Sequence, residues 1–252
     1  MRVATYNIQH GRSESDRRVD VDRFAAAVRA LDVDVLVLQE VDHHQSRSRR
    51  AVLTEVAAEA MGGAQHRFVP TMRGTPGLWR RAGSVPVGRP AYGIAVLSRV
   101  PVLEWDTVRL AGRPGITWVG SGRVRRPVRD EPRAAVVAVV STDSGPASVV
   151  GTHLSWLSSW NGRQLEVLVE ATSRWPRPTV LMGDLNMLPA QATATSGFTP
   201  LATAATYPVA KPVRQIDHVL GLGAVRATGP ATSVDTGLSD HRALVVDLAF
   251  GS

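Results

Sequence analysis

Thr179-Val180-Leu181-Met182-Gly183-Asp184-Leu185-Asn186 is a short apolar run followed by two polar residues, and this arrangement recurs through the chain. The run at 179–182 is typical of a buried strand. A carboxylate is seldom buried without a partner, so its position at the end of such a strand is informative. We therefore expect Asp184 and Asn186 to lie where this strand ends, close to polar groups from other strands.

Other apolar runs also end in, or contain, polar residues of this kind. The residues concerned are Asn7, Glu40, His153, Asp217, Asp240 and His241. Several carboxylates that converge where strands end provide the oxygen ligands that a hard cation such as Mg²⁺ requires. Such a site also suits phosphoester hydrolysis, in which a carboxylate orients water and a histidine stabilises charge on phosphorus.

Strands outnumber helices in the pattern of apolar residues. We expect strands at 3–8, 34–41, 67–72, 92–98, 102–110, 134–141, 148–153, 179–182, 216–220, 225–232 and 243–248, and helices at 19–31, 51–61 and 164–175. Residues 73–90 and 111–132, rich in Gly, Pro and Arg, are expected to be loops. Because most neighbouring strands are close in sequence, antiparallel or mixed sheets in layers with outer helices are favoured. No linker separates two compositions, so we expect one domain over 1–252.

Composition excludes several classes of protein. A chain of 252 residues with 44% hydrophobic residues and a mean hydropathy of −0.04 can bury a sizeable core, which excludes a disordered protein. No stretch approaches the roughly 20 apolar residues of a membrane helix. The absence of cysteine excludes disulfide scaffolds, cysteine-ligated zinc, iron–sulfur clusters and thiol nucleophiles. No targeting segment is visible at the N-terminus, so we expect a cytoplasmic protein.

Net charge also bears on function. With 29 basic and 22 acidic residues the chain carries +7, which favours an anionic partner such as nucleic acid, phosphate esters or an acidic membrane surface. The segments 73–89 and 109–133 are rich in arginine, with Trp79 and Trp118 among them. Arginine interleaved with tryptophan suits phosphate backbones and stacked bases. The competing interpretation is a solvated loop shaped by codon bias, since Lys211 is the only lysine.

Seven short stretches, taken together, resemble a known family. They are Thr5-Tyr6-Asn7-Ile8-Gln9, Leu38-Gln39-Glu40-Val41-Asp42, Tyr92-Gly93-Ile94-Ala95-Val96-Leu97-Ser98-Arg99, Gly151-Thr152-His153-Leu154, Gly183-Asp184-Leu185-Asn186, Ile216-Asp217-His218 and Ser239-Asp240-His241. Their order and spacing over residues 5–241 resemble the endonuclease/exonuclease/phosphatase superfamily, which has the DNase I-like fold. The resemblance implies an α+β fold, a four-layer α/β/β/α sandwich of two mixed, mainly antiparallel sheets with outer helices.

The resemblance also implies a role for each residue of the site. Glu40 would be the main ligand of Mg²⁺ or Mn²⁺, with Asn7 beside it and Asp240 on the same side. Asp184 would orient or deprotonate the attacking water, and Asn186 would bind a phosphate oxygen or position Asp184. His241 would contact the scissile phosphate. Asp217 would orient a catalytic histidine, most plausibly His153, which would act near the leaving group.

Substrate contacts are expected from basic and aromatic residues. The candidates are Arg133, Arg125, Arg126 and Trp118. Gln9 stands where many family members carry an acidic residue or asparagine, which weakens a role for position 9 in binding metal. His218 should face away from Asp217 and have a structural role, because adjacent residues in a strand point to opposite faces. Gly221-Leu222-Gly223 lacks the third glycine of a dinucleotide-binding fingerprint, so a hairpin is favoured there.

Three functions remain open from the sequence. The first is a divalent-metal-dependent phosphodiesterase acting on DNA or RNA, which the arginine-rich loops favour. The second is a phosphatase or phosphodiesterase acting on a small molecule, an inositol phosphate or a lipid headgroup, since a fold does not fix its substrate. The third is a non-catalytic binding module on the same fold, which is disfavoured because Glu40, Asp184 and His241 are all present. We expect no obligate protein partner; endo- or exo-cleavage and the number of metal ions stay open.

Overall fold

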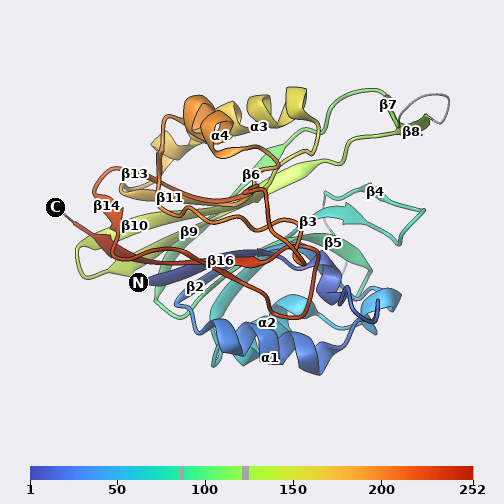
Figure 1. The fold of residues 1–252 in the computed structure, drawn as a ribbon, viewed down its shortest axis with the longest axis horizontal. Coiled ribbons are helices and arrows are strands. Elements are labelled where there is room, and N and C mark those ends of the chain that lie inside the picture. The colour runs from blue at the N-terminus through green and yellow to red at the C-terminus, as the bar shows by residue number, and fades with distance from the viewer. Residues whose placement is uncertain (84, 86–87, 121–124, 252) are drawn as a thin grey trace.

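Two β-sheets pack face to face with helices on both outer sides in the computed structural model, which describes residues 1–83, 85, 88–120 and 125–251 (Figure 1). The first sheet has the strand order β14-β16-β1-β2-β5-β3-β4, with β15 on β16. Its strands are β1 (Arg2–Asn7), β2 (Val35–His43), β3 (Gln65–Arg73), β4 (Arg80–Arg81), β5 (Ala91–Ser98), β14 (Val225–Ala227), β15 (Thr232–Val234) and β16 (Ala243–Phe250).

The second sheet has the order β12-β13-β11-β10-β9-β6. Its strands are β6 (Val102–Leu110), β9 (Arg133–Thr142), β10 (Gly145–His153), β11 (Thr179–Asp184), β12 (Thr199–Pro200) and β13 (Asp217–Leu222). In both sheets together, β1 with β2 and β10 with β11 pair in parallel, and the other pairs are antiparallel. The predicted α+β sandwich of mixed, mainly antiparallel sheets with outer helices is confirmed.

Helices cover the outer face of each sheet. The helices α1 (Val21–Leu31) and α2 (Leu53–Ala60) cover the first sheet, and α3 (Ser158–Ala171) and α4 (Pro189–Ser196) cover the second (Figure 1). Helix α1 begins where the Asp20 carboxylate accepts a hydrogen bond from the backbone of Arg23, as expected of an N-cap. Its buried face includes Phe24, Val28 and Leu31, which share one side of a helix with 3.6 residues per turn.

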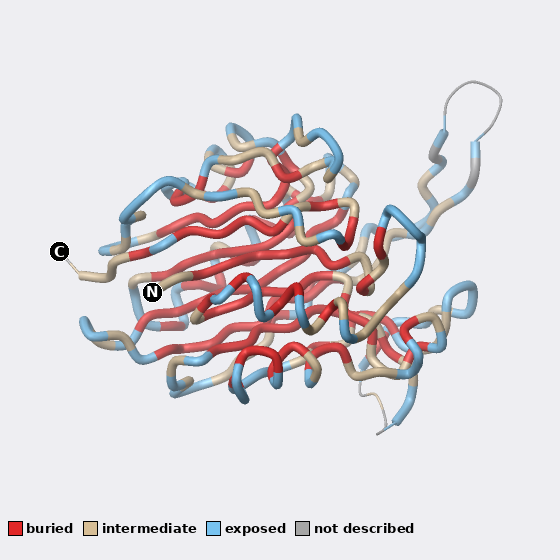
Figure 2. The backbone as a smooth tube through the Cα atoms, turned by 60° about the horizontal axis from the view of Figure 1, so that its bottom comes forward, coloured by how far each residue is buried: buried red, intermediate tan, exposed pale blue. Residues whose placement is uncertain are grey.

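The inner faces of the two sheets form the central core. Val37 of β2, Val96 of β5 and Val149 of β10 are fully buried within it, and Figure 2 shows the buried strands stacked between exposed loops. Gly151 of β10 sits where the sheets approach most closely, since a Cβ atom there would lie 2.7 Å from methyl groups of Val37 and Val96. This glycine lets the end of β10 pack directly against the first sheet, which brings the ends of the two sheets together.

The structure corrects several predicted elements. Helix α3 begins at Ser158, six residues before the predicted start, and α4 lies where no helix was predicted. The predicted loop at 111–132 contains a hairpin formed by β7 (Thr117–Val119) and β8 (Arg126–Val128), and the predicted strand at 225–232 is two short strands, β14 and β15. Within the described residues, no helix is both long and apolar enough to span a membrane.

Candidate active site

Polar residues meet where the two parallel strand pairs end. Asn7 ends β1 and Glu40 lies near the end of β2, while His153 and Asp184 end β10 and β11 as register partners. Asp217 begins β13, which runs antiparallel to β11 and therefore places it opposite Asp184. The carboxyl ends of both parallel pairs thus open onto one edge of the sandwich, as expected from the sequence.

The backbone is strained around this edge. Glu40 has φ 58°, and the pairing of β2 with β5 shifts register between Leu38 and Val41, which is a β-bulge at Glu40. Asn186 (φ 53°) and Ser239 (φ 64°) also adopt the left-handed conformation. Strain of this kind persists where the surrounding structure enforces it, and it is concentrated at functional sites. The bulge changes the face of the sheet towards which the Glu40 side chain points, and this side chain lines the cavity.

Asp184 lies at the centre of the cluster and is only 2% exposed. Its Oδ2 accepts a hydrogen bond from Nδ2 of Asn7 at 3.0 Å and lies 3.6 Å from Nε2 of His153 and 3.8 Å from Nε2 of His241. Its Oδ1 accepts from the backbone N–H of Asn186 at 3.0 Å. Burial and the neighbouring charge of Asp217 raise the pKa of Asp184 to about 7. A carboxylate with such a pKa is suited to accept a proton at neutral pH.

His241 is held by Asp217. Its Nδ1–H donates to Oδ2 of Asp217 at 2.9 Å, and the Thr206 hydroxyl donates to the same oxygen. Burial lowers the pKa of His241, but the charge and hydrogen bond of Asp217 outweigh burial and raise it to about 10. His241 is therefore a cation, and the prediction that Asp217 orients His153 is wrong. The error arises because His241 lies just before β16 of the first sheet and contacts Asp217 in β13 of the second sheet, a contact between sheets that the sequence does not reveal.

His153 has a different partner. A guanidinium can only donate, so Nη1 of Arg133, 3.2 Å away, requires Nδ1 of His153 to accept and leaves the ring proton on Nε2. Burial, followed by the charges of Arg133 and His241, holds the pKa of His153 well below its usual range. His153 is therefore a neutral donor whose Nε2–H faces Asp184; Nδ2 of Asn186, 3.4 Å from the same nitrogen, is also a donor and so cannot form a hydrogen bond with it. Arg133 itself is buried and lies 3.6 Å from Glu131.

Two groups of side chains could hold a divalent cation. The ligand atoms of Asp184, Asp217 and His241 lie within 4.8 Å of one another. In that group Oδ2 of Asp217 already accepts two hydrogen bonds, while its buried Oδ1 has no partner among the described residues. The carboxylate of Glu40 instead has a single donor, Nδ2 of Asn7 at 3.3 Å, and burial and the charge of Asp240 raise its pKa. A half-buried carboxylate that lines the cavity with so little compensation suits a cation, and Glu40 with Asp240 is the better pair.

Asn7 differs from its predicted role as a ligand. Its amide nitrogen donates to both Glu40 and Asp184, and its Oδ1 accepts from the backbone N–H of Gln9 at 3.1 Å. The amide therefore holds the two carboxylates together and would have to turn for its oxygen to reach a cation. Asn186 has its amide fixed by donation to the carbonyl oxygen of Leu154 at 3.1 Å. Its backbone N–H helps to position Asp184, and its predicted role in binding a phosphate oxygen stays a prediction.

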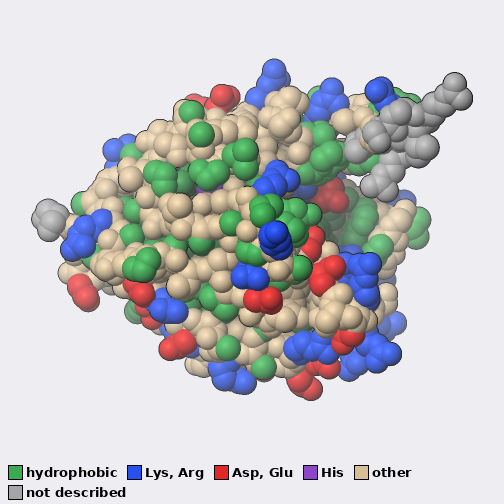
Figure 3. Space-filling view, viewed as in Figure 1, with side chains coloured by type: hydrophobic (Ala, Val, Ile, Leu, Met, Phe, Trp, Pro, Cys, Tyr) green, Lys and Arg blue, Asp and Glu red, His purple; other side chains and the backbone are tan. Residues whose placement is uncertain are grey.

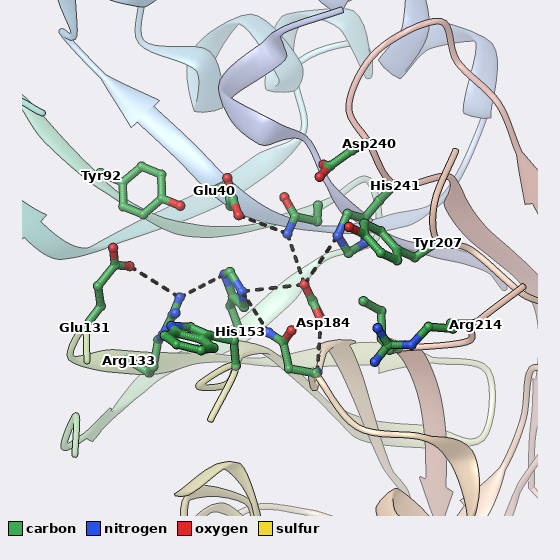
Figure 4. Close-up of a pocket in the computed structure, with 14 residues that line it drawn as sticks. Glu40, Tyr92, Glu131, Arg133, His153, Asp184, Tyr207, Arg214, Asp240 and His241 are labelled. Carbon is green, nitrogen blue, oxygen red and sulfur yellow. Dashed lines mark hydrogen bonds and ion pairs between the residues drawn. The ribbon is translucent and has the colours of Figure 1, made fainter. Parts of the chain in front are cut away.

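These residues line a cavity of about 450 Å³ (Figure 4). Glu131, Arg133 and His153 lie to one side of Asp184, while Tyr207 and Arg214 lie to the other. The sequence reasoning did not identify five of the lining residues as part of the site: Tyr92, Glu131, Tyr207, Arg214 and Ile216. Figure 3 shows acidic side chains in a recess on the side from which the β7–β8 hairpin extends.

The remaining predicted residues lie outside this cavity. Trp118 and Arg125 are exposed on and beside the β7–β8 hairpin, and Arg126 lies in β8 with a side chain outside the described part of the structure. Of the four predicted substrate contacts, the cavity itself receives only Arg133. His218 is hydrogen-bonded through Nε2 to the carbonyl oxygen of Met187 at 2.8 Å, which confirms its structural role.

A buried ion pair supports the strand that carries Glu40. The carboxylate of Asp42 is fully buried and accepts from Nε and Nη2 of Arg47 at 2.9 and 2.7 Å. The guanidinium of Arg47 also lies 5.6 Å from the ring centre of Tyr92 and 5.9 Å from that of Trp79. Burial already raises the pKa of Asp42 in spite of this pairing. The Arg47 side chain thus joins the bulged strand to an aromatic wall of the cavity.

Replacing Arg47 with methionine is expected to lower the free energy of unfolding by about 3–5 kcal/mol, because it leaves a buried charge unpaired. The loss should be smaller at pH 5 than at pH 8, since the raised pKa of Asp42 makes the folded state bind a proton more tightly than the unfolded state. Denaturant titration of Arg47→Met and of Arg47→Met/Asp42→Asn measures it, and the double variant should recover most of the stability. Arg23→Met, which removes the exposed pair with Asp16, is the control and should stay close to the wild type.

Comparison with known proteins places these observations in context. The model of the Endonuclease/Exonuclease/phosphatase family matches residues 4–241. No curated protein sequence matches the chain. Among solved structures, an endonuclease/exonuclease/phosphatase from Beutenbergia cavernae is similar over 100% of this chain and 72% of its own, with 24% identity and a TM-score of 0.72.

Two further structures are similar at lower identity. A mannosyl-6-phosphatase from Bacteroides thetaiotaomicron matches 99% of this chain and 100% of its own, with 14% identity and a TM-score of 0.67. The human Nocturnin catalytic domain with a bound sulfate anion matches 100% of this chain and 94% of its own, with 17% identity and a TM-score of 0.65. At these identities the likeness shows a shared fold.

Proposed function

Because the chain belongs to the endonuclease/exonuclease/phosphatase family, whose members are generally phosphoester hydrolases, we propose that it is a divalent-metal-dependent phosphodiesterase acting on nucleic acid. The observation that carries the proposal is the position of Asp184, buried between a neutral histidine and a cationic one at the base of an open cavity. A proton acceptor placed between two donors is the arrangement that attack by water on a phosphoester needs.

Each residue has a distinct task in the proposed reaction. Asp184 accepts a proton from water as the water oxygen forms its bond to phosphorus. The charged His241 donates to an oxygen of the phosphate, where negative charge accumulates. The Nε2–H of His153 stabilises the leaving oxygen as its bond to phosphorus breaks. Glu40 and Asp240 would hold Mg²⁺ or Mn²⁺, and such an ion neutralises charge on the phosphate oxygens.

Nucleic acid is the preferred substrate class because of charge. The chain carries +7, and arginines are concentrated in the two segments 73–89 and 109–133. Arg133 of the second segment lines the cavity, and the β7–β8 hairpin extends from the same rim. Arrays of arginine bind a polyanion through many phosphates at once, which a single small phosphoester does not require.

A small phosphoester, an inositol phosphate or a lipid headgroup is the second candidate class. The cavity of about 450 Å³ has the size of a small-molecule site, and the same fold is found in a protein described as a mannosyl-6-phosphatase. A phosphate monoester would place its extra charge beside Arg133 and Arg214 on the two sides of Asp184. This class does not explain the arginines outside the cavity.

A panel of phosphoesters tests the proposal. Single-stranded DNA, RNA, duplex DNA, sugar phosphates and inositol phosphates are incubated with Mg²⁺ or Mn²⁺, with and without chelator, and Asp184→Ala is the control. We expect cleavage of nucleic acid that requires the metal ion and falls steeply with salt. Release of phosphate from a small ester with no cleavage of any nucleic acid would instead establish the second candidate.

A further inference from the structure

The β7–β8 hairpin with its flanking segments, residues 111–120 and 125–132, is here called the arm. It extends away from the sandwich (Figures 1 and 2). Its return strand leads directly into Glu131 and Arg133, which line the cavity. From the rim at Arg133 to Pro127 on β8 is six residues, or about 20 Å of extended chain. The arm therefore begins at the site and reaches well beyond it.

The base of the arm is fixed to the catalytic edge. The carbonyl oxygen of Ala111 accepts from Nε1 of Trp160 at 2.9 Å and from Nε2 of Gln164 at 2.8 Å. On the return strand, Asp130 accepts from the hydroxyl of Ser155 at 2.8 Å. The three donors belong to the segment that follows the catalytic histidine. These hydrogen bonds hold the base of the arm in a set position relative to the reacting groups.

One face of the arm is both aromatic and basic. Trp118 is 61% exposed and pairs across the hairpin with Pro127, so both side chains lie on the same face. Ile116, Arg125 and Arg129 lie two residues along the chain from Trp118 or Pro127, just outside the ends of the two strands. Both arginines are exposed, and neither forms an ion pair within the described residues. An exposed tryptophan close in sequence to two exposed arginines is a combination suited to stacking a base and contacting backbone phosphates.

We propose that this face of the arm binds a single-stranded segment of nucleic acid several nucleotides from the scissile phosphate. An unpaired base stacks on Trp118, and backbone phosphates lie beside Arg125 and Arg129. The proposal rests on the proposed function and adds to it the form of the substrate. Stacking on an aromatic ring needs a base whose face is free, and the bases of a duplex are already stacked and paired.

The depth of the site favours the same form of substrate. Asp184, His153 and His241 are each at most 5% exposed, so the reacting phosphate has to enter the cavity. A flexible single strand can follow the arm and turn into the cavity, which a backbone fixed in a duplex cannot do without unpairing. A flat bilayer resting on Trp118 would lie about 20 Å beyond the rim, out of reach of the catalytic groups. A single strand can present an unpaired base to Trp118 and can also bring its phosphate into the cavity.

The test separates binding from cleavage. Affinity for a fluorescent single-stranded oligonucleotide is measured in the Asp184→Asn background, in which cleavage is expected to be too slow to consume the probe. Adding Trp118→Ala should weaken binding about 10- to 100-fold, and Trp118→Phe should recover most of it, because stacking is retained. Arg129→Gln should reduce the slope of log affinity against log salt by about 0.7, the value for one phosphate contact of a single strand. Arg226→Gln, an exposed arginine of β14, is the control.

The outcomes distinguish this proposal from the function on which it rests. Single-strand affinity that is independent of Trp118, or stronger binding to duplex, overturns the arm proposal even if the enzyme cleaves nucleic acid. Trp118-dependent binding to vesicles of anionic lipid, with no binding to single strands, also overturns it. Trp118-dependent single-strand binding by an enzyme that cleaves no nucleic acid supports the arm proposal and defeats the proposed function.

Discussion

Replacing Asp184 with asparagine is expected to lower kcat by about 10³-fold or more while leaving substrate affinity within a few-fold. Asparagine keeps the size of the side chain, and its Oδ1 can still accept from the backbone of Asn186. It cannot take a proton from water between pH 5 and 9. The expected result is therefore a loss in kcat with KM nearly unchanged, measured on whichever phosphoester the wild type cleaves best.

Stability provides the control for this variant. Folding raises the pKa of Asp184 to about 7, so ionisation of this residue lowers the stability of the protein as the pH rises from about 4 to 7. The loss of stability persists at higher pH. Asp184→Asn should therefore unfold at the same temperature as the wild type, or higher, at pH 8. Asp247→Asn, an exposed carboxylate on β16, should retain full activity. Activity of Asp184→Asn within tenfold of the wild type would remove Asp184 from the mechanism.

Much of the site was predictable because strand ends carry a local signal. The apolar runs before Asp184 and before Glu40 each identify a buried strand, and the polar residue that follows each run lies towards the carboxyl end of that strand. The parallel pairing of β1 with β2 and of β10 with β11 then places both edges on the same side. No local pattern reveals the bulge at Glu40, which depends on the register of β2 against β5.

Pairs of side chains that are distant in the sequence were harder to predict. The sequence offers Asp217 two histidines, and the choice between them depends on how the chain before β16 crosses from one sheet to the other. Nδ1 of His153 already has Arg133 as its partner, and the sequence identified Arg133 only as a candidate substrate contact. Residues such as Arg214 and Tyr207 lie in a segment with no apolar period, so their place in the cavity follows from the fold alone.

The missed elements have a common physical cause. Helix α4 buries only Ala192 and Ser196, so its residues show no apolar stripe of helical period. In the β7–β8 hairpin, the strand side chains that the structure describes are half-buried or exposed, and a strand without a buried face shows no alternation of apolar and polar residues. An apolar period appears in a sequence where an element is buried against a core, and neither of these elements has much buried surface.

Replacing Glu40 with glutamine is expected to lower kcat/KM by about 10³-fold and to abolish stabilisation by divalent cations. In the wild type, Mg²⁺ at ten times its Kd should raise the unfolding temperature by about 3–5 °C, because an ion that binds only the folded state stabilises it by mass action. Without metal, Glu40→Gln should be more stable than the wild type. Burial raises the pKa of Glu40, so its charge destabilises the folded state at neutral pH and glutamine relieves that cost.

The stabilities of the wild type and Glu40→Gln with and without Mg²⁺ distinguish a metal ligand from a carboxylate that only lines the cavity. Glu104→Gln, an exposed residue of β6, should show the same rise with Mg²⁺ as the wild type. Equal stabilisation of the wild type and Glu40→Gln by Mg²⁺ would contradict Glu40 as a ligand. If Asp217→Asn then lost the stabilisation, the cation would lie with Asp184 and His241 instead. In that case His241 would bind metal as a neutral ring, and the charged donor of the proposed mechanism would be absent.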